Sequence, residues 1–167
     1  MNIPNKLPDL IELFRRLGAP DPEAWAKSQT DEGIQQLHRY LFLRQAWSAV
    51  VSEQDKAWIE QSLAATRQDP DAPFAGVGRA LANLLATGAR REDLVDLVRG
   101  MQVQTMYRIC YLLGDPSFDE PELDDLGWSL VVESDDEQAT RQYIGGLHES
   151  VLETDPTGRE MRPRKAD

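Results

Sequence analysis

The chain has 167 residues, enough for one domain whose hydrophobic core needs no disulfide or metal to stabilise it. Its 41% hydrophobic and 28% charged residues are ordinary for a soluble protein, which excludes the disordered and membrane-embedded classes. The 18 basic and 29 acidic residues give a net charge of -11, and a negative surface disfavours binding to nucleic acid.

No apolar run approaches the roughly 20 residues of a membrane span, so no membrane contact is expected. The first ten residues also lack the basic and then apolar order of a secretion signal. The single cysteine, Cys110, cannot form a disulfide within the chain, and its apolar neighbours favour a buried structural thiol. These features predict a cytoplasmic protein.

Three helices are predicted in the first 51 residues. Residues 8–17 begin with a proline that suits a first helical turn, and their apolar residues share one face. A short helix carrying Trp25 begins at Asp21 and Pro22. A longer helix is predicted over residues 30–51, capped by Thr30 and Asp31, because its apolar residues recur at about helical spacing.

Two further helices are predicted over residues 52–67 and 74–86, separated by a polar, proline-containing break at 69–73. Gly76 and Gly78 should weaken the second of these helices by roughly 1 kcal/mol each relative to alanine. The same glycines raise the question of a phosphate-binding loop, but no strand precedes them and no Gly-Lys-Ser/Thr follows. Close helix packing or a loose helix start is the preferred interpretation.

Residues 91–113 predict one long helix, and we expect the rest of the chain to pack around it. At about 100° per residue, seven residues form the stripe expected to face the core: Leu94, Leu97, Val98, Met101, Thr105, Ile109 and Leu112. After Gly100, apolar residues surround the whole circumference, which indicates a helix covered on most sides. Arg108 lies at the edge of the stripe, so we expect a structural ion pair with Asp119 or Glu122.

The acidity is concentrated in residues 115–137, the acidic segment, which contains ten acidic residues and no lysine or arginine. Such a concentrated negative field attracts basic surfaces. Aromatic side chains within or beside the acids are typical anchors of binding energy. We therefore predict an interaction surface formed by Phe118, Asp119, Glu120, Glu122, Asp124, Asp125 and Trp128.

In residues 128–133, Trp128, Leu130 and Val132 alternate with Ser129, Val131 and Glu133, which is the period of a β-strand. Residues 140–144 are the candidate returning strand. The predicted fold class is therefore mainly α, a single-domain orthogonal helical bundle around the long central helix. It comprises residues 1–155, with a small C-terminal β-hairpin at about residues 128–144. Residues 156–167 are expected to form a mobile or surface-lying tail.

One group of residues near the C-terminus has the composition of an acid-base site: His148, Glu149, Asp155 and Arg159. A helix over residues 147–154 would place Glu149 and Glu153 on one face, and the following turn could return Arg159 towards them. The alternative is that these groups are solvated or form local pairs. One thiol and two distant histidines offer no metal-ligand spacing, so we expect no metal and no cofactor.

The preferred functional hypothesis is a noncatalytic acidic interaction protein that presents its acidic segment to a basic protein partner. It would act as an adaptor, a regulator or an immunity-type inhibitor, and the chain contains no motif of a known enzyme class. One alternative is a small hydrolase or metal-assisted enzyme that uses His148 and neighbouring carboxylates. Another is a small-ligand sensor with an interhelical pocket near Tyr40, Trp47, Met106 and Tyr107. The sequence is also compatible with a symmetric homodimer.

Overall fold

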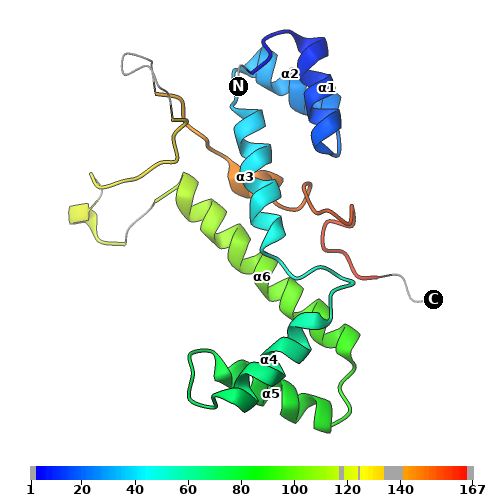
Figure 1. Ribbon diagram of the computed structural model, residues 1–167. Helices are drawn as coiled ribbons and strands as arrows, with labels where there is room; N and C mark the ends of the chain where they lie inside the picture. Colours follow the sequence, from blue (N-terminus) through cyan, green and yellow to red (C-terminus); the bar gives the residue numbers. More distant parts are fainter. Residues whose placement is uncertain (1–2, 117–118, 124, 134–140, 165–167) are drawn as a thin grey trace. The chain divides into compact units, whose positions relative to one another are not determined.

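The computed structural model describes residues 3–116, 119–123, 125–133 and 141–164, and it is mainly helical (Figure 1). The described residues form six α-helices and two short 3-10 helices: α1 Leu7–Leu17, α2 Pro22–Glu32, α3 Gln36–Ser48, α4 Ala57–Gln68, α5 Ala75–Ala86, α6 Arg91–Gly114, η1 Pro121–Leu123 and η2 Leu147–Ser150. The predicted helical bundle is confirmed. Within the described part of the chain, no helix combines the length and the hydropathy that crossing a lipid bilayer requires.

The helix ends follow local backbone chemistry, but the predicted starts of two helices are wrong. The helix predicted from residue 52 begins at Ala57, and the helix predicted from residue 30 begins at Gln36. The α1 helix ends at Gly18, whose φ of 83° suits the left-handed cap that glycine adopts without strain. The Asp21 side chain caps α2 by accepting a hydrogen bond from the Ala24 amide at 3.0 Å. Thr30 does not start a new helix as predicted, because its hydroxyl donates to the Ala26 carbonyl within α2. The break comes at Gly33, with φ of 72°.

The chain divides into two compact units. Unit 1 contains residues 1–49 and 105–167, and unit 2 contains residues 50–104. Helix α6 contributes its first part to unit 2 and its second part to unit 1.

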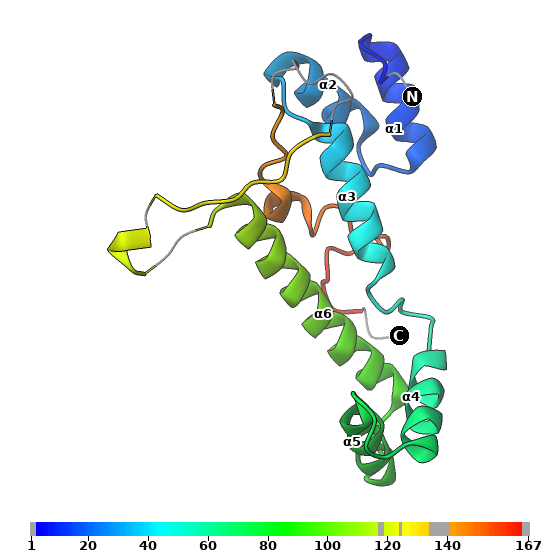
Figure 2. The same cartoon turned by 60° about the vertical axis from the view of Figure 1, so that its left-hand side comes forward.

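Unit 1 has an aromatic core where α1, α2 and α3 meet (Figure 2). The rings of Phe14, Trp25 and Tyr40 contact one another, with centroids 5.5 to 6.0 Å apart. All three residues are buried, and the tilted and edge-on geometries are those that aromatic quadrupoles favour. This cluster packs the two N-terminal helices against α3.

The segment around η2 packs beside α3 and the second half of α6 (Figure 2). A helix over residues 147–154 would turn Leu147, Val151 and Leu152 inward, but only Leu147 and Val151 are fully buried, and Leu152 is 41% exposed. The Trp47 indole nitrogen donates to the Val151 carbonyl at 3.0 Å and to Thr154 Oγ1 at 3.1 Å. Hydrogen bonds between residues more than a hundred positions apart thus hold the C-terminal segment of unit 1 against α3.

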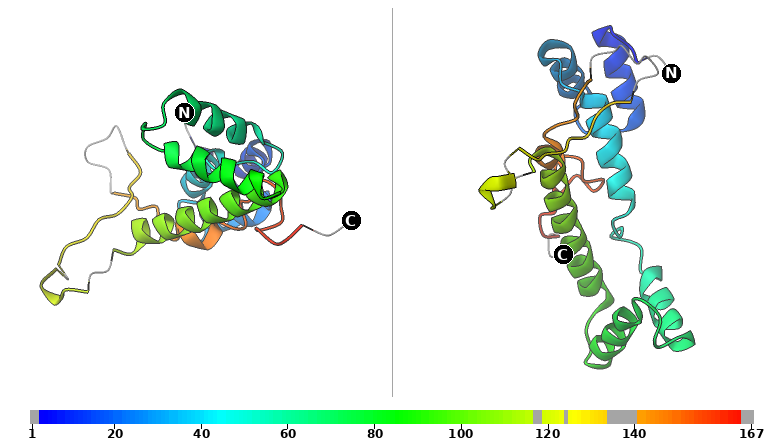
Figure 3. Two further views of the ribbon diagram at one scale, coloured as in Figure 1. Left: turned by 90° about the horizontal axis from the view of Figure 1, so that it is seen from below. Right: turned by 90° about the vertical axis from the view of Figure 1, so that its left-hand side faces the viewer.

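Unit 2 is built on close packing between α4 and α5, which lie side by side (Figure 3). A Cβ atom added at Gly78 would overlap Thr66 Oγ1 and the Ser62 carbonyl, so only glycine fits at this crossing. Five apolar residues from α4, α5 and the start of α6 form the core of the unit: Ile59, Leu63, Leu81, Leu94 and Val95. The structure therefore supports the close-packing interpretation of Gly78.

The buried face of α6 differs from the predicted one. Leu97, Met101, Ile109 and Leu112 are 49 to 60% exposed, whereas the sequence placed all of them in the core. Leu94 is buried as predicted, but the other buried positions form a neighbouring line with steps of three and four residues: Val95, Arg99, Val103, Met106 and Cys110. Because α6 is apolar around much of its circumference, periodicity could not show which face its neighbours would cover.

The predicted β-hairpin is not supported, because the described residues contain no strand. They contain one isolated antiparallel bridge, between Val131 and Tyr143, flanked by bonds from Val132 to Gln142 and from Ile144 to Leu130. Val131 and Tyr143 are 42% and 58% exposed, so the pair lacks the covered face that a two-stranded ladder needs for stability.

Candidate interaction surface

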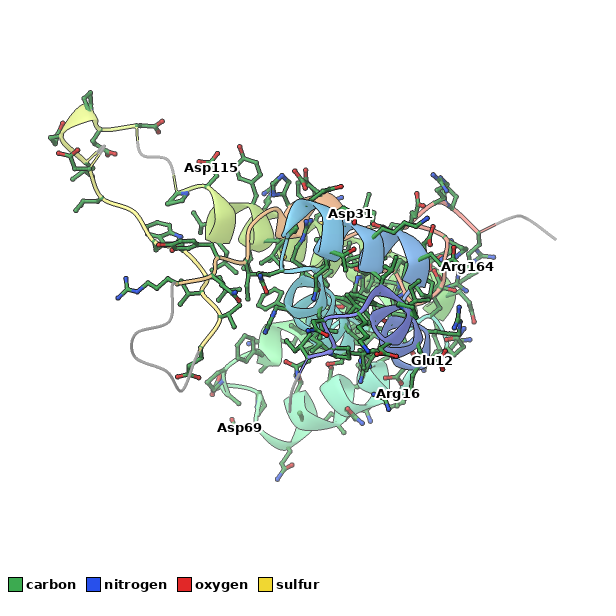
Figure 4. All side chains as sticks on the ribbon, turned by 90° about the horizontal axis from the view of Figure 1, so that it is seen from above. Glu12, Arg16, Asp31, Asp69, Asp115 and Arg164 are labelled. Atoms are coloured by element: carbon green, nitrogen blue, oxygen red, sulfur yellow. The ribbon has the colours of Figure 1, made fainter. Side chains whose placement is uncertain are left out.

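The acidic segment starts where α6 ends. The Tyr111 hydroxyl donates to Asp115 Oδ2 at 3.1 Å, and the Asp115 amide donates to the Tyr111 carbonyl at 2.9 Å. The hydrogen bond to Asp115 and the charge of that carboxylate both raise the pKa of Tyr111, so the phenol keeps its donor proton. Asp115 is thereby held at the C-terminal end of the helix (Figure 4).

Trp128 attaches the later part of the acidic segment to the same helix end. Its indole nitrogen donates to the Leu112 carbonyl at 2.8 Å, one of the carbonyl groups that a helix end leaves without an intrahelical partner. The ring itself remains 45% exposed. Asp115 and Trp128 therefore anchor two points of the segment, and the described acids between them are exposed.

The predicted acidic contact residues that the structure describes are all exposed: Asp119, Glu120, Glu122 and Asp125. The short helix η1 and the bond from the Leu126 amide to the Leu123 carbonyl, 2.8 Å long, fold this part into consecutive turns. Among the ion pairs of the described residues, none involves these four carboxylates. Their negative charge is therefore not neutralised locally. Phe118 and Asp124 lie outside the described residues.

Large apolar side chains are exposed on the second half of α6 and on the described residues that follow it. They range from 42 to 59% exposed: Ile109, Leu112, Leu126, Trp128, Val131 and Tyr143. The sequence singled out only Trp128 for binding and placed Ile109 and Leu112 in the core. Unit 1 thus exposes both apolar and acidic side chains, the two kinds of group that protein interfaces combine.

Arg108 does not form the predicted ion pair with Asp119 or Glu122 in the described residues, and its side chain is exposed. We therefore expect Arg108→Ala to change the free energy of unfolding by less than about 0.5 kcal/mol, as for an ordinary surface position. Urea denaturation followed by circular dichroism measures this change. A loss above about 1.5 kcal/mol would show that Arg108 has a partner in the folded protein.

The buried arginine of unit 1 is Arg39, which sequence reasoning missed. Its Nη2 atom donates to the Gly146 carbonyl at 2.5 Å and to Ser150 Oγ at 3.1 Å, and it lies 3.4 Å from Glu149 Oε2. The residue is only 5% exposed, so these contacts compensate much of the cost of removing the guanidinium from water. Arg39 is a structural tie between α3 and η2, and no spacing in the sequence predicts it.

The alternative acid-base group has contacts that are structural. The His148 ring packs against Tyr107 and Tyr111, with centroids 5.9 and 4.8 Å away. Its buried Nδ1 atom has no hydrogen-bond partner in the described residues, so no carboxylate orients it as a general base would require. Glu149 instead lies beside the buried Arg39.

Asp155 is 4% exposed and organises the turn that follows it. Its carboxylate accepts bonds from the Thr157 amide, the Thr157 hydroxyl and the Met161 amide, at 2.8 to 3.1 Å. The Arg159 guanidinium donates to the Arg162 carbonyl further along the same segment. Residues 156–164 therefore fold back on a buried aspartate, and residues 165–167 of the predicted tail lie outside the described residues.

Within the described residues, no three histidine, cysteine or acidic side chains are placed to share a metal ion. Cys110 is 1% exposed, and burial raises the pKa of its thiol, which agrees with the predicted structural role. No family model, no curated protein and no solved structure matches this chain.

Proposed function

We propose that this chain is a noncatalytic interaction protein whose acidic segment binds a basic protein partner, as an adaptor, a regulator or an immunity-type inhibitor. The observation that supports this best is a group of exposed carboxylates that form no ion pair within the described part of the chain: Asp119, Glu120, Glu122 and Asp125. Like charges held close together repel one another, and a positively charged surface would be attracted to them and would relieve this repulsion.

The neighbouring apolar side chains support a macromolecular partner over a free cation. A flat, charged surface attracts its partner and orients it, but most of the binding energy of an interface comes from buried aromatic and aliphatic anchors. Trp128 and Leu126 are exposed beside the acids by 45% and 59%, and they provide such anchors. The proposed compartment is the cytoplasm, where a free thiol such as Cys110 stays reduced.

The test compares two variants with the same change in charge. The segment variant carries Asp119→Asn, Glu120→Gln, Glu122→Gln and Asp125→Asn. The control variant neutralises four exposed acids on other elements: Asp9→Asn, Glu23→Gln, Asp31→Asn and Asp71→Asn. Each protein is immobilised, and the proteins captured from the source lysate at low ionic strength are identified and quantified.

We expect the wild-type chain to capture a basic protein that elutes by about 0.5 M salt, because the Debye length then falls to a few ångströms. The segment variant should bind this protein at least about tenfold more weakly, whereas the control variant should keep its affinity. Equal weakening in both variants would show that total charge matters and the acidic segment does not. A partner that binds independently of salt would also contradict the proposal.

A further inference from the structure

Unit 1 contains a cleft of about 450 Å³, separate from the acidic segment. Three parts of the chain line it: residues 18–20 after α1, one side of α3, and residues 153–158 after η2. Its volume lies within the range of about 300 to 1,000 Å³ that is typical of small-molecule sites. The cleft is partly open to solvent, and its lining is more apolar than polar.

Two aromatic residues of α3 form a fixed wall of the cleft. Tyr40 and Trp47 are 4% and 3% exposed, and each uses its polar atom in a hydrogen bond within the protein. The Tyr40 hydroxyl donates to the Leu17 carbonyl at 3.0 Å, and the Trp47 indole donates to Val151 and Thr154. These rings are already ordered, so a ligand that packs on them loses little affinity to rearrangement of the site.

Two opposite charges line the same cleft without neutralising each other. The Arg44 Nη1 atom donates to the Leu17 carbonyl at 3.2 Å, and Glu153 Oε1 accepts a bond from the Trp25 indole at 2.9 Å. In the described residues neither side chain forms an ion pair. Each is therefore positioned by one hydrogen bond and keeps further donors or acceptors for a ligand.

The geometry points to a binding site for a small aromatic zwitterion, an aromatic amino acid or dipeptide, in this cleft. Its carboxylate would pair with Arg44, its ammonium group with Glu153, and its apolar body would pack on Tyr40 and Trp47. Asp155 also lines the cleft, but its carboxylate already accepts three bonds from its own turn. This inference does not rest on the proposed function of the acidic segment.

The four tryptophans give a direct measurement of binding. In ¹⁵N-labelled protein, the indole signals of Trp25 and Trp47 report on the cleft, because Trp47 lines it and Trp25 binds its Glu153. Trp58 and Trp128 belong to unit 2 and the acidic segment, so they are internal controls. The probes are L-phenylalanine and L-phenylalanyl-L-phenylalanine, which contribute no indole signal. Each is compared with its N-acetylated form and its C-terminal amide, which keep one charge.

At least one zwitterionic probe should shift the Trp25 and Trp47 signals with a Kd of about 1 mM or lower, and leave the other two unchanged. Its singly charged forms should bind at least about tenfold more weakly. The inference is wrong if neither zwitterion shifts the two signals, or if the singly charged forms bind equally well.

Two substitutions connect this binding to the proposed residues. Arg44→Gln and Glu153→Gln should each weaken the binding about tenfold, and the second keeps an oxygen that can accept the Trp25 bond. The matched control is Arg16→Gln, at an exposed arginine on the surface of α1 (Figure 4). Unchanged binding in both cleft variants, or equal weakening in the control, would overturn the inference. Because Arg44 also donates a hydrogen bond to the Leu17 carbonyl, the melting temperature of the Arg44→Gln variant is measured too. If Arg44→Gln does not fold, the binding of Glu153→Gln decides the outcome.

Discussion

Trp47→Ala is expected to lower the free energy of unfolding of unit 1 by about 3 to 5 kcal/mol, the usual cost of deleting a buried indole. The side chain is 3% exposed, and alanine would leave a cavity between α3 and the segment after η2. It would also remove the donor that binds the Val151 carbonyl and Thr154 Oγ1. Losing a partner inside a folded core adds to the cost of the cavity.

Chemical denaturation of the full chain measures this change, with far-ultraviolet circular dichroism for the helices. Because the two units can unfold separately, the amide exchange rates of α3 and η2 are measured as well. Trp47→Phe keeps an aromatic ring but loses the donor. Its free energy of unfolding should lie between those of the wild type and Trp47→Ala. Trp128→Ala is the matched control at a 45% exposed indole and should cost no more than about 1.5 kcal/mol. Equal losses for the two alanine variants would show that Trp47 does not pack in the core of unit 1.

The Trp47 contacts show where sequence information is sufficient and where it is not. Helical spacing predicts that Trp47 and Val151 are apolar positions facing a core, and both are buried. Their contact joins residues 104 positions apart. Periodicity within one sequence shows which residues face a core, but it does not show which distant residues meet there. Helix ends depend on one or two residues, so Gly18 and the cap at Asp21 could be predicted. The end of α2 at Gly33 was not predicted, because Thr30 and Asp31 are also residue types that favour the start of a helix.

The same limit explains the arginines of α6. Sequence reasoning selected Arg108 as the arginine beside the core, but Arg108 is exposed and Arg99 is 3% exposed. Arg99 Nη1 donates to the Val51 carbonyl at 2.9 Å, so its charge is stabilised by the backbone that precedes α4. On a helix with apolar residues all round, the burial of an arginine depends on where its neighbours pack. The exposed carboxylates of the acidic segment could be predicted because a cluster of like charges cannot be buried without partners.

Gly78→Ala is expected to destabilise unit 2 by about 1 to 3 kcal/mol, the range measured for overpacked cores. The added methyl group would overlap the Ser62 carbonyl, a backbone atom that moves only if α4 and α5 separate. Helix propensity acts in the opposite direction, because alanine is better than glycine in a helix by up to about 1 kcal/mol. A net loss of stability would therefore show that the steric cost exceeds the propensity gain.

Gly76→Ala is the matched control two residues earlier in the same helix. A Cβ atom at Gly76 meets nothing within 4 Å, so only the propensity term applies and stability should rise by about 0.5 to 1 kcal/mol. Both variants make the same chemical change, and both affect the entropy of the unfolded chain in the same way. Opposite signs in their unfolding free energies can then come only from the contact between α4 and α5. If both substitutions stabilise the protein, the helices do not approach as closely at Gly78 as the structure shows, and the pair of glycines reflects a weak helix start.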